Sequence, residues 1–295
     1  MNETHPEHFD SIVSVEWVAE RLGRPDIVIA DCRFDLADAE AGRKAYERDH
    51  IPGAIYFDLE RDLSRPATAS HADPMSMGGR HPLPTVEHMV ALFGAAGIGD
   101  GVTVVCYDDQ KGGMAGRLWW MLRYLGHQRA ALLDGGYTAW RAAGKPVAAE
   151  VPQPVPRTFV PRLQPHMLAT MDEVRSASAA RRGIIIDSRA PERYRGEVEP
   201  LDPVAGHIPG AVNLPWQGNV GPDGLMLDTH ALAQRFASIM DNKEGVIVHC
   251  GSGVTGCLNV LALERAGVSG VKLYVGGWSE WCSHPDNPVA VGAES

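Results

Sequence analysis

One of the five cysteines stands where a buried-strand pattern meets a glycine-rich turn. The stretch VIVHCGSGVTGC runs from Val246 to Cys257, and its β-branched residues end just before Cys250. Gly251 and Gly253 permit the backbone angles of a tight turn, and a helical pattern follows. Successive N–H groups of such a turn, with the helix N-terminus, form a nest for negative charge, which favours the reactive thiolate. The sequence therefore predicts that Cys250 is a nucleophile.

The other four cysteines give weaker signals. Cys32 and Cys106 lie inside β-rich runs, where a cysteine most often acts as a small buried hydrophobic residue. Cys257 falls at the start of the helical pattern, where packing is favoured over a role as resolving thiol, and Cys282 gives no indication. None of the spacings suggests a disulfide framework or a zinc site, so we expect reduced thiols and no metal.

Phosphatase chemistry does not fit this loop. A Cys-x5-Arg phosphatase needs an arginine after its turn, because the phosphoryl transition state is stabilised by a guanidinium. That position, six residues after Cys250, is Gly256 here. The sequence therefore argues against this class of enzyme.

Four segments of the chain occur twice in the same order. The first set is IVIADCR (27–33), DHIPGAIYFDL (49–59), TVVCYD (103–108) and LLDGGYTAW (132–140), and the second is IIIDSR (184–189), GHIPGAVNLPW (206–216), VIVHC (246–250) and LYVGGWSEW (273–281). The offsets lie between 141 and 157 residues, too long for a solenoid repeat. They indicate a duplicated domain.

A proline-rich connector separates the two copies. Six prolines lie between Pro146 and Pro165. Because proline fixes φ and lacks an N–H, this segment is expected to be extended and fairly stiff. With the boundary placed near residue 155, the sequence predicts an N-terminal domain over residues 10–150 and a C-terminal domain over residues 165–290.

Each copy alternates short apolar β-rich runs with helical patterns. IVIAD, TVVCYD and AALLD in the first copy, and IIIDS, VIVHC and VKLYV in the second, are separated by segments such as AGRLWWMLRYLG and TGCLNVLALERAG. This alternation predicts an α/β fold with two domains, each a parallel sheet flanked by helices on both faces. Such sheets bind ligands at the carboxyl ends of their strands, where Cys250 is placed.

Composition limits the partners. The 295 residues carry a net charge of −10, and 44% are hydrophobic, as in a globular protein. The missing basic footprint argues against nucleic acid or an anionic membrane as partner. No secretory signal and no membrane span is recognised, so a cytoplasmic protein is expected. A site for an anionic substrate must be locally positive.

Together, CGSGVTGC, GHIPGAVNLPW, DSRAPERYRG and GGWSEW resemble the tandem-domain rhodanese-type sulfurtransferases, and the similarity runs from about Ser14 to Pro288. The resemblance implies two rhodanese-like domains, of which the second is catalytic. In that family the loop cysteine takes a sulfur atom from a donor as a persulfide and passes it on. The form CGSGVT is similar to the mercaptopyruvate branch. A persulfide anion also suits the nest, which can donate several charge-assisted hydrogen bonds to it.

The resemblance also implies further site residues. In the family a histidine ahead of a Leu-Pro pair sits beside the loop serine, with an acidic residue upstream; these positions are His81, Ser252 and Glu60 here. Without the resemblance, His81 would be taken for a solvated histidine of a long Ser-, Pro- and Gly-rich loop. The loop residues expected to hold the donor and the persulfide are Gly251, Gly253, Val254 and Thr255.

Donor recognition needs a cation. Arg193 has no counterpart in the first copy and matches the family's substrate arginine, whereas Arg189 mirrors Arg33 and is expected to form a structural ion pair. The mercaptopyruvate branch has a second arginine shortly before the GHIPG motif, and Leu201 stands there instead. The donor therefore stays open between 3-mercaptopyruvate, which the loop favours, and thiosulfate.

The two copies are not equivalent at the loop. Asp108 takes the place of Cys250, and a carboxylate cannot carry a sulfane sulfur, so the first copy is expected to be non-catalytic. We expect no metal or organic cofactor, and a thiol, thioredoxin-like protein or cyanide as acceptor. The alternative is a sulfur-carrier module that acts only with protein partners.

Overall fold

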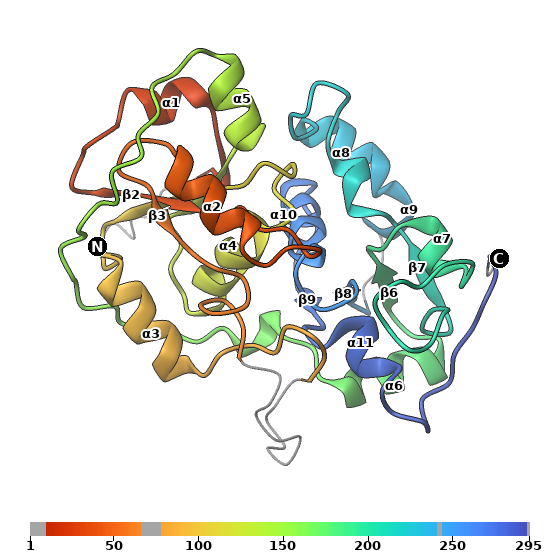
Figure 1. Ribbon diagram of the computed structural model, residues 1–295. Helices are drawn as coiled ribbons and strands as arrows, with labels where there is room; N and C mark the ends of the chain where they lie inside the picture. Colours follow the sequence, from red (N-terminus) through yellow and green to blue (C-terminus); the bar gives the residue numbers. More distant parts are fainter. Residues whose placement is uncertain (1–9, 66–77, 241–243, 294–295) are drawn as a thin grey trace, which may run out of the picture.

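A five-stranded parallel sheet organises the N-terminal half of the chain (Figure 1). The computed structural model describes residues 10–65, 78–240 and 244–293. The strand order is β1-β5-β4-β2-β3, and the apolar runs of the sequence form its central strands. The strands are β1 (Ile12–Val13), β2 (Ile27–Asp31), β3 (Ile55–Tyr56), β4 (Thr103–Tyr107) and β5 (Ala130–Leu133).

A four-stranded parallel sheet repeats this arrangement in the C-terminal half, in the order β7-β6-β8-β9. A single parallel bridge between Leu168 and Leu273 lies beside β9, where β1 lies beside β5 in the first sheet. The second copy thus has one residue in place of the first copy's edge strand. Its strands are β6 (Ile184–Asp187), β7 (Ala211–Asn213), β8 (Val246–His249) and β9 (Val271–Leu273).

Helices cover both faces of the first sheet. Ala30 and Cys106 point into a core shared with α3 and α4, whereas Ile29 and Val105 point to the opposite face, against α1 and α5. This alternation explains why the strands are apolar throughout. The helices of this half are α1 (Val15–Ala19), α2 (Ala41–Arg48), α3 (Val86–Ala95), α4 (Ala115–Tyr124) and α5 (Gly136–Ala142).

The second sheet is covered in the same way. Ile186 and Val248 face α8 and α10, and Ile185 faces the side that holds α6, α7 and α11. The predicted α/β class with two such domains is confirmed. The helical segments are η1 (Pro165–Met167), α6 (Met171–Ala180), α7 (Pro191–Tyr194), η2 (Trp216–Asn219), α8 (Thr229–Arg235), α9 (Ala237–Met240), α10 (Gly256–Arg265) and α11 (Gly277–Trp281).

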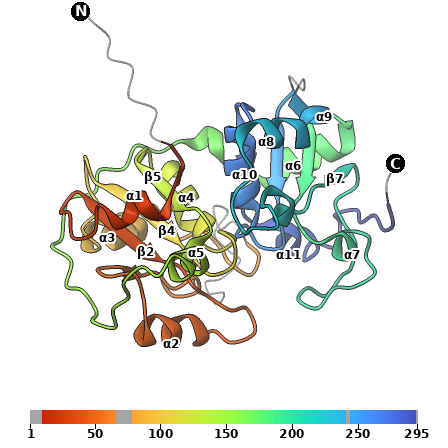
Figure 2. The ribbon, with the colours of Figure 1, turned by 90° about the horizontal axis from the view of Figure 1, so that it is seen from above.

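Helices α4 and α10 join the two halves (Figure 2). Their apolar side chains belong to one continuous core that includes strands of both sheets. The helices approach closely at Gly116, where an added Cβ would lie 3.3 Å from the backbone nitrogen of Leu258. Each of these helices follows the loop at the carboxyl end of its sheet's central strand, so the packing brings the two loops toward one interface.

The proline-rich connector runs along the outside of the N-terminal half (Figure 1). Its backbone N–H groups at Arg157 and Arg162 donate to carbonyl groups at the ends of α3 and α4, those of Gly94 and Leu125. Residues 149–164 form no helix or strand, as the prolines predict. Among the described residues, no helix is long and apolar enough to cross a membrane.

Candidate active site

Cys250 follows β8 directly, at the carboxyl end of the second sheet, and is 2% exposed. Two glycines make its turn possible. Gly253 has φ +70°, and a Cβ there would lie 2.3 Å from the carbonyl oxygen of Val275. Gly277, with φ +60°, lets the N-terminus of α11 approach so closely that a Cβ would lie 2.6 Å from the Cys250 carbonyl. The neighbouring Trp278 N–H donates to that carbonyl at 2.8 Å. The cysteine backbone is therefore held by contacts that only glycine permits.

The turn after Cys250 presents unpaired backbone donors. Within the described part of the chain, the N–H groups of Gly251 to Thr255 donate to no other protein group. Gly251, Ser252, Gly253 and Val254 are buried, and Thr255 caps α10. Buried N–H groups without partners are rare because each carries a desolvation cost. Unpaired donors in the turn that directly follows a buried cysteine can hold a sulfur anion.

Ser252 meets a histidine from the other half of the chain. The Nδ1 atom of His81 lies 2.7 Å from the Ser252 hydroxyl oxygen, and both side chains are buried. Burial, and then the positive charges of Arg117 and Arg80, lower the pKa of His81 to about 3. His81 is therefore a neutral imidazole at pH 7, and its hydrogen bond with Ser252 fixes the direction of the serine hydroxyl. The structure brings this predicted pair together.

Glu60 does not complete that pair. Its side chain is exposed, and in the described part of the chain no hydrogen bond or ion pair joins it to His81. The buried carboxylate nearby is Asp58, which accepts the N–H groups of Glu60 and Arg61 at 3.0 Å and so caps a turn. The charges that act on His81 are cationic. The geometry gives Glu60 no contact through which to act on His81.

Arg193 lies beside the loop. An added Cβ on Gly251 would lie 3.6 Å and 3.7 Å from its two terminal nitrogens. The guanidinium donates to both carboxylate oxygens of Glu199, at 2.6 Å and 3.2 Å, and Glu199 also accepts from Arg189. The predicted substrate arginine is thus held by a buried carboxylate through Nε and Nη2, and its other terminal nitrogen, Nη1, also lies near Gly251. It can present that nitrogen to an anion bound over the loop.

The two arginines that mirror each other form structural ion pairs. Arg33 donates to Asp31 at 2.7 Å and Arg189 to Asp187 at 2.6 Å, and both pairs are buried. Each guanidinium also donates to a main-chain carbonyl just before its His-Ile-Pro-Gly turn. The pairing predicted from the repeat is present in both copies, and it ties that turn to the neighbouring strand.

The first copy fills its own nest. The carboxylate of Asp108 accepts the N–H groups of four residues of its loop, at 2.7–2.8 Å: Gln110, Gly112, Met114 and Ala115. Burial raises the pKa of Asp108, and these four bonds act in the opposite direction. Cys106 is buried within β4, and Cys32 is buried directly after β2, so both pack as small hydrophobic residues, as expected. The first copy thus has a side-chain carboxylate at the position where the second copy has the Cys250 thiol.

Arg117 was not predicted as a site residue. This side chain of α4 is wholly buried and donates to the carbonyl oxygens of Gly253, at 2.9 Å, and of Leu63 and His81. Within the described chain it forms no ion pair, and its charge interacts with the thiols of Cys257 and Cys250. An arginine in the otherwise apolar segment AGRLWWML was the available signal. Arg117 connects the cysteine loop to the backbone of His81.

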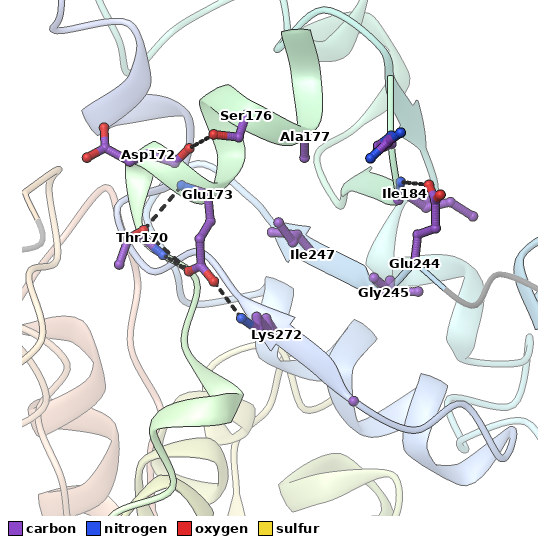
Figure 3. A pocket seen from close by; sticks show the side chains of 14 residues that line it. Thr170, Asp172, Glu173, Ser176, Ala177, Ile184, Glu244, Gly245, Ile247 and Lys272 are labelled. Atoms are coloured by element: carbon purple, nitrogen blue, oxygen red, sulfur yellow. Dashed lines mark hydrogen bonds and ion pairs between the residues drawn. The ribbon is translucent and has the colours of Figure 1, made fainter. Parts of the chain in front are cut away.

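A cavity of about 420 Å³ lies away from this chemistry (Figure 3). It is lined by the start of α6 and by the amino ends of β6, β8 and β9, and the Lys272–Glu173 ion pair spans part of it. Cys250 follows the opposite, carboxyl end of β8. The cavity therefore does not belong to the candidate active site.

Comparison with known proteins agrees with this arrangement. The model of the rhodanese-like domain matches residues 14–143 and again residues 170–284. The chain belongs to the rhodanese family. It is 41% identical to a probable 3-mercaptopyruvate sulfurtransferase of Pseudomonas aeruginosa over 286 residues, 95% of this chain and 98% of that one. It is 38% identical to a putative thiosulfate sulfurtransferase of Mycobacterium tuberculosis, covering 90% and 91% of the two chains.

A solved relative has the same fold. The crystal structure of SseA from Escherichia coli, described as a 3-mercaptopyruvate sulfotransferase, matches with a TM-score of 0.77 and 32% identity, over 92% of this chain and all of that one. The predicted class, a tandem-domain rhodanese-type sulfurtransferase, is confirmed. This rhodanese-family chain has its cysteine only in the second of the two loops.

Proposed function

We propose that this rhodanese-family chain moves a sulfane sulfur from 3-mercaptopyruvate to a thiol or to cyanide, through a persulfide on Cys250. The observation that carries the proposal is the set of unpaired N–H groups from Gly251 to Thr255 around a buried thiol. These donors are placed for a negative sulfur rather than for a neutral side chain. The Pseudomonas aeruginosa relative and SseA, both named for 3-mercaptopyruvate, support the choice of donor.

The first half-reaction forms one S–S bond and breaks one C–S bond. The Cys250 thiolate attacks the thiol sulfur of 3-mercaptopyruvate, and the electron pair of the C–S bond stays on carbon as the enolate of pyruvate. Ser252, hydrogen-bonded to His81, passes a proton to this enolate to give pyruvate, and it takes a proton in turn from the new persulfide, which carries the former thiol proton of the donor. The Cys250 persulfide, once deprotonated, accepts hydrogen bonds from Gly251 to Thr255.

The second half-reaction returns Cys250 to its thiolate. A thiolate or cyanide attacks the outer sulfur, the S–S bond breaks, and its electron pair returns to Cys250. The products are a persulfide or thiocyanate. We propose that the acceptor is a low-molecular-weight thiol or a thioredoxin-like protein in the cytoplasm, since five free cysteines and no disulfide among the described residues suit a reducing compartment.

Arg193 binds the donor's negative end. Mercaptopyruvate carries a planar carboxylate, which a guanidinium can engage through two N–H groups, whereas thiosulfate has no carboxylate. Thiosulfate remains the second candidate donor because a relative that is 38% identical bears that name.

The test compares kcat/KM for the two donors with cyanide as acceptor. We expect mercaptopyruvate to be the better donor. A higher kcat/KM for thiosulfate would overturn the assignment of the donor. Absence of turnover with both, together with sulfur loading from a partner protein, would favour the sulfur-carrier alternative.

A further inference from the structure

A second guanidinium lies over the loop beside Arg193. An added Cβ on Gly251 would lie 2.9 Å from a terminal nitrogen of Arg80, nearer than either terminal nitrogen of Arg193. Arg80 belongs to the N-terminal half and precedes His81. Two arginines from different halves of the chain thus converge on the residue that follows the nucleophile.

The backbone around Arg80 is firmly placed. Its N–H donates to the Ser279 hydroxyl at 3.1 Å, and the Gly78 N–H donates to Glu280 at 2.7 Å. Gly79 has φ +82°, and a Cβ there would lie 2.5 Å from Ser279 Oγ. This segment is seated on α11, which also holds the Cys250 backbone. The position of Arg80 relative to the loop is therefore fixed by the same helix that fixes the cysteine.

The two arginines share one buried carboxylate. Asp202 forms an ion pair with Arg80, and its other oxygen, Oδ2, lies 3.5 Å from an Nη atom of Arg193. The Asp202 side chain is 3% exposed, and Oδ2 accepts no hydrogen bond from the described residues. An ionised buried oxygen without a donor is costly. The site thus holds two guanidiniums that share one protein carboxylate, and a donor carboxylate that hydrogen-bonds both of them could replace it.

The absence of an arginine at position 201 does not leave the site with a single cation. The sequence lacks an arginine there, but the Leu201 side chain is 42% exposed, and the next residue is the buried Asp202. The second cation of the site enters from the other half of the chain. A keto-acid carboxylate has two oxygens in one plane, which two guanidiniums can grip together more firmly than one.

We propose that Arg80 is a substrate-binding residue that grips the donor's carboxylate together with Arg193, and that Asp202 holds both arginines until the donor engages them. This inference rests on the proposed function and names a residue of the same site. It assigns the N-terminal half a direct contact with the donor.

The test measures how strongly the enzyme prefers an acid donor over an uncharged one. The acid is 3-mercaptopyruvate, and its methyl ester lacks the negative charge. We expect Arg80→Ala to lower the ratio of kcat/KM for acid over ester about ten- to a hundredfold. Arg80→Lys should give a smaller loss, because it keeps the charge without the fork. An equal loss for both donors, as a merely structural role predicts, or no loss, would overturn the proposal.

Two further variants sharpen the test. Arg195→Ala is the matched control, because Arg195 follows α7, pairs with Glu197 and is half-exposed; its acid-to-ester ratio should stay within about twofold of the unmodified protein. Asp202→Asn removes the competing carboxylate and should lower KM for the acid about three- to tenfold. A higher KM for the acid would contradict the role given to Asp202.

Failure of the proposed function would look different. If the unmodified protein does not turn over mercaptopyruvate, the donor assignment falls, and the carboxylate site is then measured through pyruvate binding by calorimetry. Weaker pyruvate binding in Arg80→Ala supports the clamp, and unchanged binding overturns it.

Discussion

The loops at the carboxyl ends of the two sheets share a backbone arrangement but differ in the side chain at its base, which is Asp108 in one and Cys250 in the other. In both loops, the backbone carbonyl of the residue after the central strand accepts a hydrogen bond from the last helix of its half. The Tyr137 N–H donates to Asp108, and the Trp278 N–H donates to Cys250, each at 2.8 Å. In the first copy the Asp108 carboxylate takes four N–H groups. In the second the N–H groups stay unpaired around the Cys250 thiol.

The difference shows what it takes to silence a site of this kind. The Asp108 carboxylate already accepts the N–H groups of its loop, so these donors are not free for an anion from outside. The first copy still contributes to the second site, because His81, Arg80 and Arg117 all reach the cysteine loop from the N-terminal half. These contacts support the prediction that the first copy helps to build the second site rather than carrying a site of its own.

The largest expected effect on activity comes from placing an aspartate at position 250, as in the loop of the first copy. Cys250→Asp and Cys250→Ser should both abolish sulfur transfer, at least a thousandfold, because neither carries a thiolate. Only the aspartate fills the nest, so its free energy of unfolding should exceed that of the serine variant by about 1–3 kcal/mol.

Turnover assays and urea unfolding measure these outcomes. Intact-mass analysis of donor-treated protein should show a gain of about 32 Da on Cys250, the sulfur atom of the persulfide intermediate. Cys282→Ser, outside the site, is the control and should keep the adduct. An adduct on Cys257 alone, or turnover in the serine variant, would disprove the nucleophile.

The reverse exchange, Asp108→Cys, should not create a second active site. Four buried N–H groups lose an ionised acceptor, so we expect the free energy of unfolding to fall by about 2–4 kcal/mol. The loop should then lose the order that a nest requires. In a Cys250→Ser background, peptide mapping of the sulfur adduct distinguishes residue 108 from the four remaining native cysteines. A persulfide found on residue 108 in that background would show that the first nest survives without its carboxylate.

Arg193→Lys tests the arginine beside the Cys250 loop, a residue that has no counterpart in the first copy. Lysine keeps the charge but loses the planar fork, so the transition state should lose about 1.5–3 kcal/mol of stabilisation. This loss corresponds to a roughly ten- to hundredfold fall in kcat/KM for mercaptopyruvate. The donor's KM should rise more than kcat falls. A variant with unchanged kinetics would remove Arg193 from the site.

The smallest effect is a dependence of stability on pH at the contact between the halves. The folded-state pKa of His81, about 3, lies below its ordinary value of 6.5, so its contribution to stability is present above pH 6.5 and is lost as pH falls toward 3. We expect His81→Asn to remove a slope of up to about 1.4 kcal/mol per pH unit in that window.

The comparison of variants isolates His81. The partly buried His127 and the buried His249 also have lowered pKa values, but they titrate in both proteins. His230→Asn, at an exposed histidine, is the matched control and should keep the full slope. Equal slopes in the unmodified protein and His81→Asn would mean that His81 is not buried as neutral imidazole.

Much of this protein follows from local sequence. The repeated segments establish the duplication, and apolar β-runs alternating with helical patterns dictate buried parallel sheets, because strands covered on both faces need no polar side. Cys250 and its glycines, and Asp108 in the equivalent position, were also readable, since a strand, a turn and a helix N-terminus are continuous in the chain.

The contacts between the halves were decided only by tertiary structure. Arg80 meets Asp202 across 122 residues and Arg117 meets Gly253 across 136. No local pattern specifies such pairs, because they depend on how α4 packs on α10 and how residues 78–81 seat on α11. The same packing leaves Glu60 exposed and Leu201 at the surface beside a buried aspartate. A side chain's chemistry is set by its residue type, but its partner is set by the fold.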